Sequence, residues 1–150
     1  MEPKKPQLIY RVAHAEVGSM LIEVTRRHHL VASEMLKEIG LVPPQELVLI
    51  RLWEWGSCSH ADMVRAFGRD RSTVTKTLQA MERAGLLERR PSEVDGRAIV
   101  ISLTARGEAL HPKVLGIWSE LERRTVRGMS ERKRREVADV LEAILANLSS

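Results

Sequence analysis

The spacing of helix starts and stops in the middle of the chain is the feature that most constrains its fold. Residues 59–62 read Ser-His-Ala-Asp, a capping-box pattern that predicts a short helix over residues 61–67. Asp70 is the next N-cap candidate, and a second helix is expected over residues 71–84, closed by Gly85 in the left-handed position. Two short helices separated by about three residues have the geometry of a helix-turn-helix.

The hydrophobic pattern changes its period directly after Gly85. Residues 87–90 and 98–103 are typical of short strands, and the second segment contains three consecutive β-branched residues. Asp95-Gly96 lies between them and is the usual dipeptide of a tight hairpin turn, in which both turn positions need positive φ. A charged hairpin that follows the second helix of a helix-turn-helix predicts a winged helix.

A long helical region precedes this lobe. A mostly apolar set of side chains recurs at three- and four-residue steps over residues 7–39, which predicts one long helix or two joined helices. These side chains are Leu8, Val12, Leu21, Val24, His28, Val31, Met35 and Ile39. Gly18 interrupts the pattern and permits a bend. Pro43 and Pro44 then fit the start of a second, largely buried helix that Gly56 ends.

A second helical region follows the hairpin. Thr104 is the cap of a helical stretch that extends to Val126, with a kink expected at His111-Pro112. Ser130 is the cap of a last helix with one apolar face. That face is formed by Val137, Val140, Leu141, Ile144, Leu145 and Leu148. A small winged-helix lobe offers the two apolar stripes no partner, so we expect them to pack against each other, against residues 105–126, or against a second chain.

Composition places the chain among globular proteins. Hydrophobic residues make up 43% of it and charged residues 29%, which excludes a disordered or low-complexity chain. No apolar run approaches the roughly 18 residues of a membrane span, and residues 1–10 lack the apolar stretch of a signal peptide. We therefore expect a cytoplasmic protein without a membrane partner. The net charge of +4 fits nucleic acid, although charge alone is weak evidence.

Few residues could hold a metal or a cofactor. Cys58 is the one cysteine, which excludes an intramolecular disulfide and a multi-cysteine metal site. The five histidines include no i,i+4 pair that would chelate a metal from one helix, so we expect no metal and no cofactor. The chain contains no GxSxG, P-loop, dinucleotide or HExxH motif, so we do not expect an enzyme.

The helix predicted over residues 71–84 has one face that suits DNA. At 100° per residue, Val74, Leu78 and Met81 fall on the inward side. The opposite side carries hydroxyls, an amide and cations but no carboxylate, and lysine and glutamine are side chains that read bases in the major groove. With the helix start and the flanks, the candidate DNA-binding residues are Arg71, Ser72, Thr73, Thr75, Lys76, Gln79 and Arg83. The alternative is an ordinary solvated face, which usually carries charges of both signs.

The predicted hairpin adds Arg89, Arg90 and Arg97. Arg97 follows the turn and is expected at the hairpin tip, where an arginine can enter a minor groove. Asp95 is expected to hold the Arg97 guanidinium through a charge-assisted bond. We take Arg90, Asp95 and Arg97 as further DNA-binding candidates. The alternative is an exposed ion pair at a hairpin tip, which contributes little.

Three segments resemble the MarR (multiple antibiotic resistance regulator) family of bacterial transcription factors. They are LVPPQELVLIRLWEWG, DRSTVTKTLQAMERAGLLERR and DGRAIVISLTARGEAL. The resemblance covers residues 10–148 in order. It implies a dimer formed by the first and last two helices, a recognition helix in the major groove and a wing arginine in the minor groove. By position, Ser72, Thr73, Thr75 and Lys76 match the groove-facing residues of the family, and Asp95 and Arg97 match its wing pair.

The resemblance also bears on the regulatory signal. In many members of the family, a small phenolic or lipophilic acid bound between the dimerisation region and the winged lobe releases the DNA. Trp53 and His28 are the ligand-binding candidates here. The alternative is core packing for Trp53 and a surface or polar-packing role for His28. Other members sense peroxide through a cysteine near the first helix, which this chain lacks, and a few bind metals. The second helix also departs from the family, since it begins without the usual Thr or Ser cap before proline.

Cys58 leaves a redox alternative open. A helix N-terminus near the short strand expected at Cys58 would lower the pKa of its thiol, whereas a small buried residue is the ordinary reading.

The sequence therefore predicts a mainly α fold with a small β wing. A winged helix-turn-helix lobe spans residues 43–103, between a dimerisation helix in residues 1–40 and C-terminal dimerisation helices in residues 104–150. We expect a homodimeric repressor that binds a pseudopalindromic operator in double-stranded DNA and is released by a small aromatic or lipophilic effector. The alternatives are a redox-sensing regulator acting through Cys58 and a winged-helix module that contacts protein rather than DNA.

Overall fold

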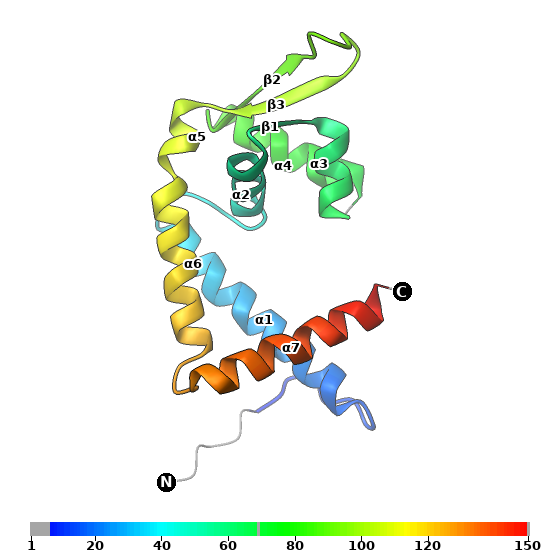
Figure 1. Cartoon of the computed structure of the whole chain (residues 1–150), viewed down its shortest axis with the longest axis vertical. Coiled ribbons are helices and arrows are strands. Elements are labelled where there is room, and N and C mark those ends of the chain that lie inside the picture. The colour runs from blue at the N-terminus through cyan, green and yellow to red at the C-terminus, as the bar shows by residue number, and fades with distance from the viewer. Residues whose placement is uncertain (1–6, 69, 150) are drawn as a thin grey trace. The chain divides into compact units, whose positions relative to one another are not determined.

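The computed structural model describes residues 7–68 and 70–149, so residues 1–6 and 150 of the expected terminal regions lie outside the described residues. It divides into two compact units, one ending at Ile117 and one beginning at Trp118, and each is described by itself. None of the described helices is long and apolar enough to cross a membrane. The elements are, in chain order, α1 (Glu16–Lys37), α2 (Gln45–Trp55), β1 (Ser57–Ser59), α3 (His60–Phe67), α4 (Arg71–Arg83), β2 (Leu87–Pro91), β3 (Ile99–Leu103), α5 (Ala105–Ala109), α6 (His111–Thr125) and α7 (Glu131–Leu148) (Figure 1).

The predicted fold class is confirmed: the chain is mainly helical, with one small antiparallel sheet. The first helix, however, is shorter than the span of residues 7–39 that the apolar pattern predicted, because α1 begins at Glu16 and ends at Lys37. His14 precedes it with φ of 61°, a left-handed conformation that cannot belong to a right-handed helix. From its start, α1 runs through Gly18 as one continuous helix.

The helix-turn-helix forms as predicted, from α3 and α4, and its caps are local. Ser59 Oγ accepts a hydrogen bond from the Asp62 N–H (3.0 Å), and the Asp70 carboxylate accepts one from the Thr73 N–H (2.8 Å). These bonds satisfy N–H groups that a helix start otherwise leaves without partners. The predicted inward face of α4 is buried, with Val74, Leu78 and Met81 in the core.

The sheet has three antiparallel strands in the order β1-β3-β2. Cys58 of β1 pairs with Ile101 of β3, and Leu87 of β2 pairs with Leu103 of β3. Cys58 therefore lies in a short strand of the sheet, as predicted. The hairpin of β2 and β3 extends past the neighbouring helices and forms the wing (Figure 1).

The tip of the wing closes with a different turn from the predicted one. Residues 92–98 connect the strands, and Gly96 lacks the positive φ that the predicted two-residue turn requires. Instead, the Asp95 carbonyl oxygen accepts from the Ala98 N–H (2.9 Å), and Asp95 Oδ1 accepts from the Arg97 N–H (3.0 Å). A carboxylate that accepts from the N–H two residues ahead makes an Asx turn, which needs no left-handed residue here.

Thr104 joins the end of α4 to the start of α5. Its hydroxyl donates to the Gly85 carbonyl oxygen (2.5 Å) and accepts from the Gly107 N–H (3.2 Å), which confirms the predicted cap. Gly107 is buried, and a Cβ at this position would lie 2.1 Å from the Leu86 carbonyl oxygen. Glycine is therefore the residue that allows the two helix ends to approach this closely.

The kink predicted near His111-Pro112 is a break between two helices. Leu110 separates α5 from α6, and α6 begins at His111. The ring of His111 lies against the ring of Trp53 on α2, with centroids 4.4 Å apart and planes inclined by 34°. This contact connects the start of α6 to the winged lobe.

The apolar face of the last helix is exposed in the described part of the chain. Ser130 caps α7 as predicted, since its Oγ accepts from the Lys133 N–H (3.3 Å). None of the residues Glu131–Leu148 is buried. On the apolar face, the exposed fractions are 58%, 49%, 66% and 78% for Val140, Leu141, Leu145 and Leu148. The predicted stripe of α1 is likewise uncovered at Val24, which is 52% exposed.

Candidate nucleic-acid interface

The outward face of α4 is rich in exposed cations. Arg71, Lys76 and Arg83 are exposed, and Gln79 is half-buried on the same helix. Within the described part of the chain, the three cations form no ion pair. The structure thus brings together the predicted cations on one helix and leaves their charge unbalanced.

The hydroxyl groups of this face are already used as donors. Ser72 Oγ and Thr73 Oγ1 both donate to the Asp70 carboxylate (2.7 and 2.6 Å), and Thr75 Oγ1 donates to the Arg71 carbonyl oxygen (2.8 Å). The bonds from Thr73 and Ser72 hold the pKa of Asp70 far below its usual range. The three hydroxyls can still accept hydrogen bonds from DNA. The donors that remain free on α4 are therefore nitrogen groups.

His60 is a neighbour of this face that the sequence pattern did not reveal. It is the first residue of α3, and its Nε2 lies 3.2 Å from Thr75 Oγ1 of α4. Partial burial, followed by the positive charges of Arg71 and Arg89, lowers the pKa of the His60 imidazole. Helical periodicity describes one helix at a time, so it carries no signal for this contact between two helices.

The wing arginines have different surroundings. Arg89 Nε pairs with Glu82 of α4 (2.8 Å) and is partly buried, so it ties β2 to the helix. Arg90 is exposed and pairs with Glu88 on the same strand (3.0 Å). Their positions give Arg89 a packing role and leave Arg90 at the surface.

Arg97 lies at the exposed tip of the wing. The predicted bond between its guanidinium and Asp95 is not present, because Asp95 Oδ1 accepts from the Arg97 backbone N–H instead. The carboxylate closes the turn, and the guanidinium forms no ion pair with any residue that the structure describes. The Arg97 side chain is thus available to a partner.

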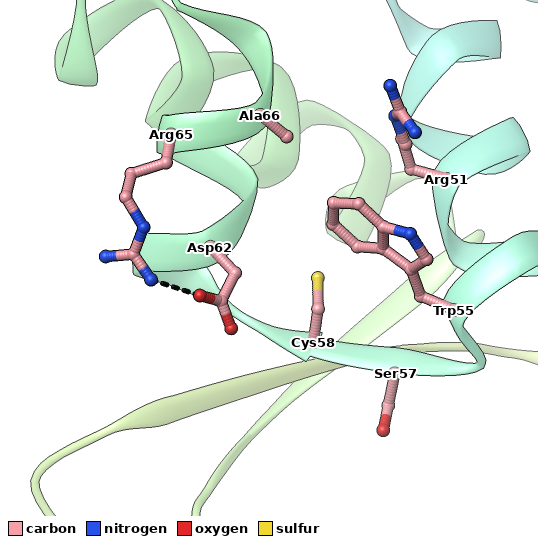
Figure 2. A pocket seen from close by; sticks show the side chains of 7 residues that line it. All are labelled: Arg51, Trp55, Ser57, Cys58, Asp62, Arg65 and Ala66. Carbon is pink, nitrogen blue, oxygen red and sulfur yellow. Dashed lines mark hydrogen bonds and ion pairs between the residues drawn. The ribbon is translucent and has the colours of Figure 1, made fainter.

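Cys58 lies at a cavity of about 600 Å³ in the winged lobe. Figure 2 shows its sulfur between Trp55 and Asp62, and the cavity is lined by Arg51, Trp55, Ser57, Cys58, Asp62, Arg65 and Ala66. Burial and the negative charge of Asp62 raise the pKa of the thiol, opposite to the lowering that the redox alternative requires. Within residues 7–68 and 70–149, no group of three or more His, Cys, Asp or Glu could hold a metal ion.

The ligand-binding candidates lie on two helices. Trp53 is half-buried on α2, and its Nε1 is buried with no hydrogen-bond partner among the described residues. His28 is half-buried on α1. Glu46, which the sequence reasoning missed, lies on α2 and is only 4% exposed, and its Oε2 likewise lacks a hydrogen-bond partner in the described chain. Burial raises the pKa of the Glu46 carboxyl.

Sequence comparison relates the chain to known regulators. A profile of the MarR family matches residues 41–99. The organic hydroperoxide resistance transcriptional regulator of Bacillus subtilis (strain 168) is 30% identical over 116 residues, which cover 77% of this chain and 76% of that protein. The HTH-type transcriptional regulator MgrA of Staphylococcus aureus is 34% identical over 83 residues, 55% of this chain and 56% of that protein.

Structure comparison finds the same fold in solved regulators. A mutant MarR from E. coli, complexed with operator DNA, has a TM-score of 0.80 at 17% identity and covers 87% of this chain and 94% of that chain. BpsR from Bordetella bronchiseptica, solved to explain regulation of its DNA binding by 6-hydroxynicotinic acid, has a TM-score of 0.79 at 24% identity. That match covers 90% of this chain and 96% of the BpsR chain. At these identities the likeness shows a shared fold.

Proposed function

Because the chain belongs to the MarR family of transcriptional regulators, we propose that it represses transcription by binding a pseudopalindromic operator as a homodimer. Family membership places it among DNA-binding regulators rather than enzymes. The observation that carries the proposal is the outward face of α4, where Arg71, Lys76 and Arg83 have no acidic partner in the described chain. A helix face with unbalanced positive charge is attracted to phosphates, and its nitrogen donors match acceptors in the major groove.

The wing supplies the second contact. Arg97 projects from the Asx turn at the tip of the hairpin, with its guanidinium free of ion pairs in the described chain. An arginine in this position enters the minor groove beside the recognition site, where narrow A-T tracts concentrate negative potential. Arg90 adds charge on the strand behind it. Major-groove and minor-groove contacts together define one half-site.

The proposed dimer is supported by apolar surface that the described residues leave exposed. Leu145 and Leu148 of α7 are 66% and 78% exposed, and Val17 of α1 is 64% exposed. Exposed apolar stripes of this size are typical of helices that pack against a partner. We infer that these helices form the interface with a second copy, which sets two recognition helices roughly one helical turn of DNA apart.

We propose a small aromatic or lipophilic molecule as the effector that regulates DNA binding. Trp53 Nε1 and Glu46 Oε2 are buried polar atoms without hydrogen-bond partners among the described residues, and they lie on one helix two turns apart. An unsatisfied buried polar atom costs about 1–3 kcal/mol, so a ligand that supplies a hydrogen bond there gains affinity. We assign Trp53, with His28 on α1, to the effector site. The raised pKa of Cys58 gives the redox alternative no support.

The test is selection of genomic fragments with the purified protein in the presence of polyanion competitor. We expect recovery of a few inverted-repeat sites, each bound by two chains, and release of the DNA by a small aromatic acid. The Cys58→Ser protein should bind and release the same sites. Recovery of random fragments only, with affinity that competitor abolishes, would contradict a specific operator. If Cys58→Ser stays on its sites under every inducing condition, the thiol is the sensor instead.

A further inference from the structure

His60 connects the two helices of the helix-turn-helix through a hydrogen bond whose direction can be assigned. Thr75 Oγ1 donates its single hydrogen to the Arg71 carbonyl oxygen (2.8 Å). It can therefore only accept from His60 Nε2, which lies 3.2 Å away. The His60 ring must carry hydrogen on Nε2, and Nδ1 is the nitrogen at which a further proton adds.

The charges that face this ring are positive. Arg71 at the start of α4 and Arg89 on β2 both act on it, and Arg89 is itself paired with Glu82 of α4 (2.8 Å). On its own helix, the nearest acid is Asp62, which forms an ion pair with Arg65. Partial burial and the two guanidinium groups favour the neutral ring in the free protein. An anion placed beside His60 and these two arginines would instead favour the protonated, positively charged ring.

DNA would supply such an anion. When the second helix of a helix-turn-helix enters the major groove, the first helix crosses the sugar–phosphate backbone. Phosphate oxygens take most contacts at such positions, and the start of α3 lies beside α4 through the bond between His60 and Thr75.

We propose that His60 is a proton-linked phosphate contact, which takes up a proton when α4 docks in the major groove and then binds the DNA backbone together with Arg71. The inference rests on the proposed function, because it requires that α4 contacts DNA. It gives a residue outside the recognition helix a role in affinity, and it makes that affinity depend on pH.

The sign of the pH dependence follows from linkage. A nearby phosphate raises the pKa of His60 in the complex above its value in the free protein, which already lies below 6.5. The added affinity is fully present below the free-protein pKa and is lost as pH rises through the pKa of the complex. Each His60 changes log affinity by at most about one per pH unit, and a dimer carries two.

The experiment compares wild type with His60→Gln, which keeps an N–H donor for Thr75 but cannot titrate. Operator affinity is measured by fluorescence anisotropy from pH 5.5 to 8 at constant salt. We expect similar affinities at pH 8 and roughly tenfold tighter binding by wild type than by His60→Gln near pH 6. The control is His14→Asn, which removes an exposed histidine at a left-handed position that asparagine tolerates.

Calorimetry of operator binding in two buffers of different ionisation enthalpy independently measures the number of protons taken up when the protein binds DNA. We expect net proton uptake by wild type on binding, reduced in His60→Gln and unchanged in His14→Asn. Equal pH slopes and equal uptake in wild type and His60→Gln would overturn the inference while leaving DNA binding intact. Absence of specific DNA binding by wild type at every pH would overturn the proposed function itself.

Discussion

Single side chains on α4 divide into those that hold the helix and those that are free for a partner. Asp70 receives the hydroxyl hydrogens of Ser72 and Thr73, so these two side chains stabilise the helix start. Lys76 is exposed and unpaired in the described chain. We therefore expect Lys76 to contribute more to base recognition than the hydroxyls next to it.

Replacing Lys76 and Arg97 separately distinguishes base reading from groove binding. Lys76→Ala should weaken operator binding by about 1–3 kcal/mol and relax preference at one or two base pairs of each half-site. Arg97→Ala should weaken binding most where the flanks are rich in A-T and should lower the salt slope by about one per wing. Both effects are measured from affinities for operator and random DNA at several salt concentrations.

The matched control is Lys113→Ala, which removes an exposed lysine from α6, outside the helix-turn-helix and the wing. All three variants should keep the melting temperature of wild type, because none of these side chains belongs to the core. Wild-type binding by both Lys76→Ala and Arg97→Ala would show that these faces are merely solvated.

Glu46 gives the stability of the protein a pH dependence of its own. Burial raises the pKa of its carboxyl above the ordinary value near 4.5, so the folded state holds the proton more tightly than the unfolded state. Stability from this group is present below pH 4.5 and is lost as pH rises through the folded-state pKa. Glu46→Gln cannot ionise. Between pH 4.5 and the folded-state pKa of Glu46, the free energy of unfolding of the variant should therefore rise relative to that of wild type by about 1.4 kcal/mol per pH unit.

The gain is measured by denaturant unfolding between pH 4.5 and 8. Glu34→Gln, on the exposed surface of α1, is the control for removing one negative charge. A difference between Glu46→Gln and wild type that stays constant over this range would contradict the prediction.

At the level of helices and strands, caps were predictable from the sequence because each acts over three residues. Ser59, Asp70 and Ser130 all accept from the N–H three positions ahead, as their spacing indicated. The wing turn was not predictable in this way. Gly96 led us to expect a left-handed turn, whereas a hydrogen bond to the Asp95 side chain closes the turn without one. Dipeptide preference describes the backbone alone and omits the hydrogen bond that a side chain adds.

Contacts between distant elements were beyond the reach of the sequence pattern. His60 and Thr75 are fifteen positions apart, and neither residue breaks the periodicity of its helix. Glu46 falls in the first turn of α2, where an acidic side chain is ordinary, and its burial depends on packing that α2 alone does not determine. The cations of α4 were predictable because helical periodicity alone gives a face its composition.

The junction of α4 and α5 provides a test at the level of elements. Gly107→Ala would place a methyl group 2.1 Å from the Leu86 carbonyl oxygen, so the backbone must shift. We expect a loss of about 1–3 kcal/mol in the free energy of unfolding. Gly116→Ala on α6 is the control, since a Cβ there meets nothing within 4 Å, and it should stabilise the helix by about 0.8–1 kcal/mol. Equal losses in the two variants would show that the close approach is unimportant.

At the scale of the whole molecule, the uncovered face of α7 predicts assembly. Leu145 is 66% exposed, so Leu145→Glu should leave the single chain folded while placing a charge in the dimer interface. Removing a buried leucine from each copy costs about 1.5–3 kcal/mol per side chain, and the buried charge adds to this loss. We expect a shift from dimer to monomer in analytical ultracentrifugation, together with weaker operator binding.

Ala143→Glu, on the opposite side of α7, adds the same charge away from the apolar face and should remain dimeric. Deletion of residues 130–150 should give insoluble or monomeric protein. A wild-type chain that sediments as a monomer at micromolar concentration would contradict the dimer.

The short helix α5 is fixed at both ends. At its start, Thr104 is bonded to Gly85 at the end of α4, and just past its end, His111 lies against Trp53 of α2. α5 is about 7.5 Å long and lies between these two contacts along the chain. We therefore expect that a displacement of the Trp53 ring would move α5 and, through Thr104, the end of α4.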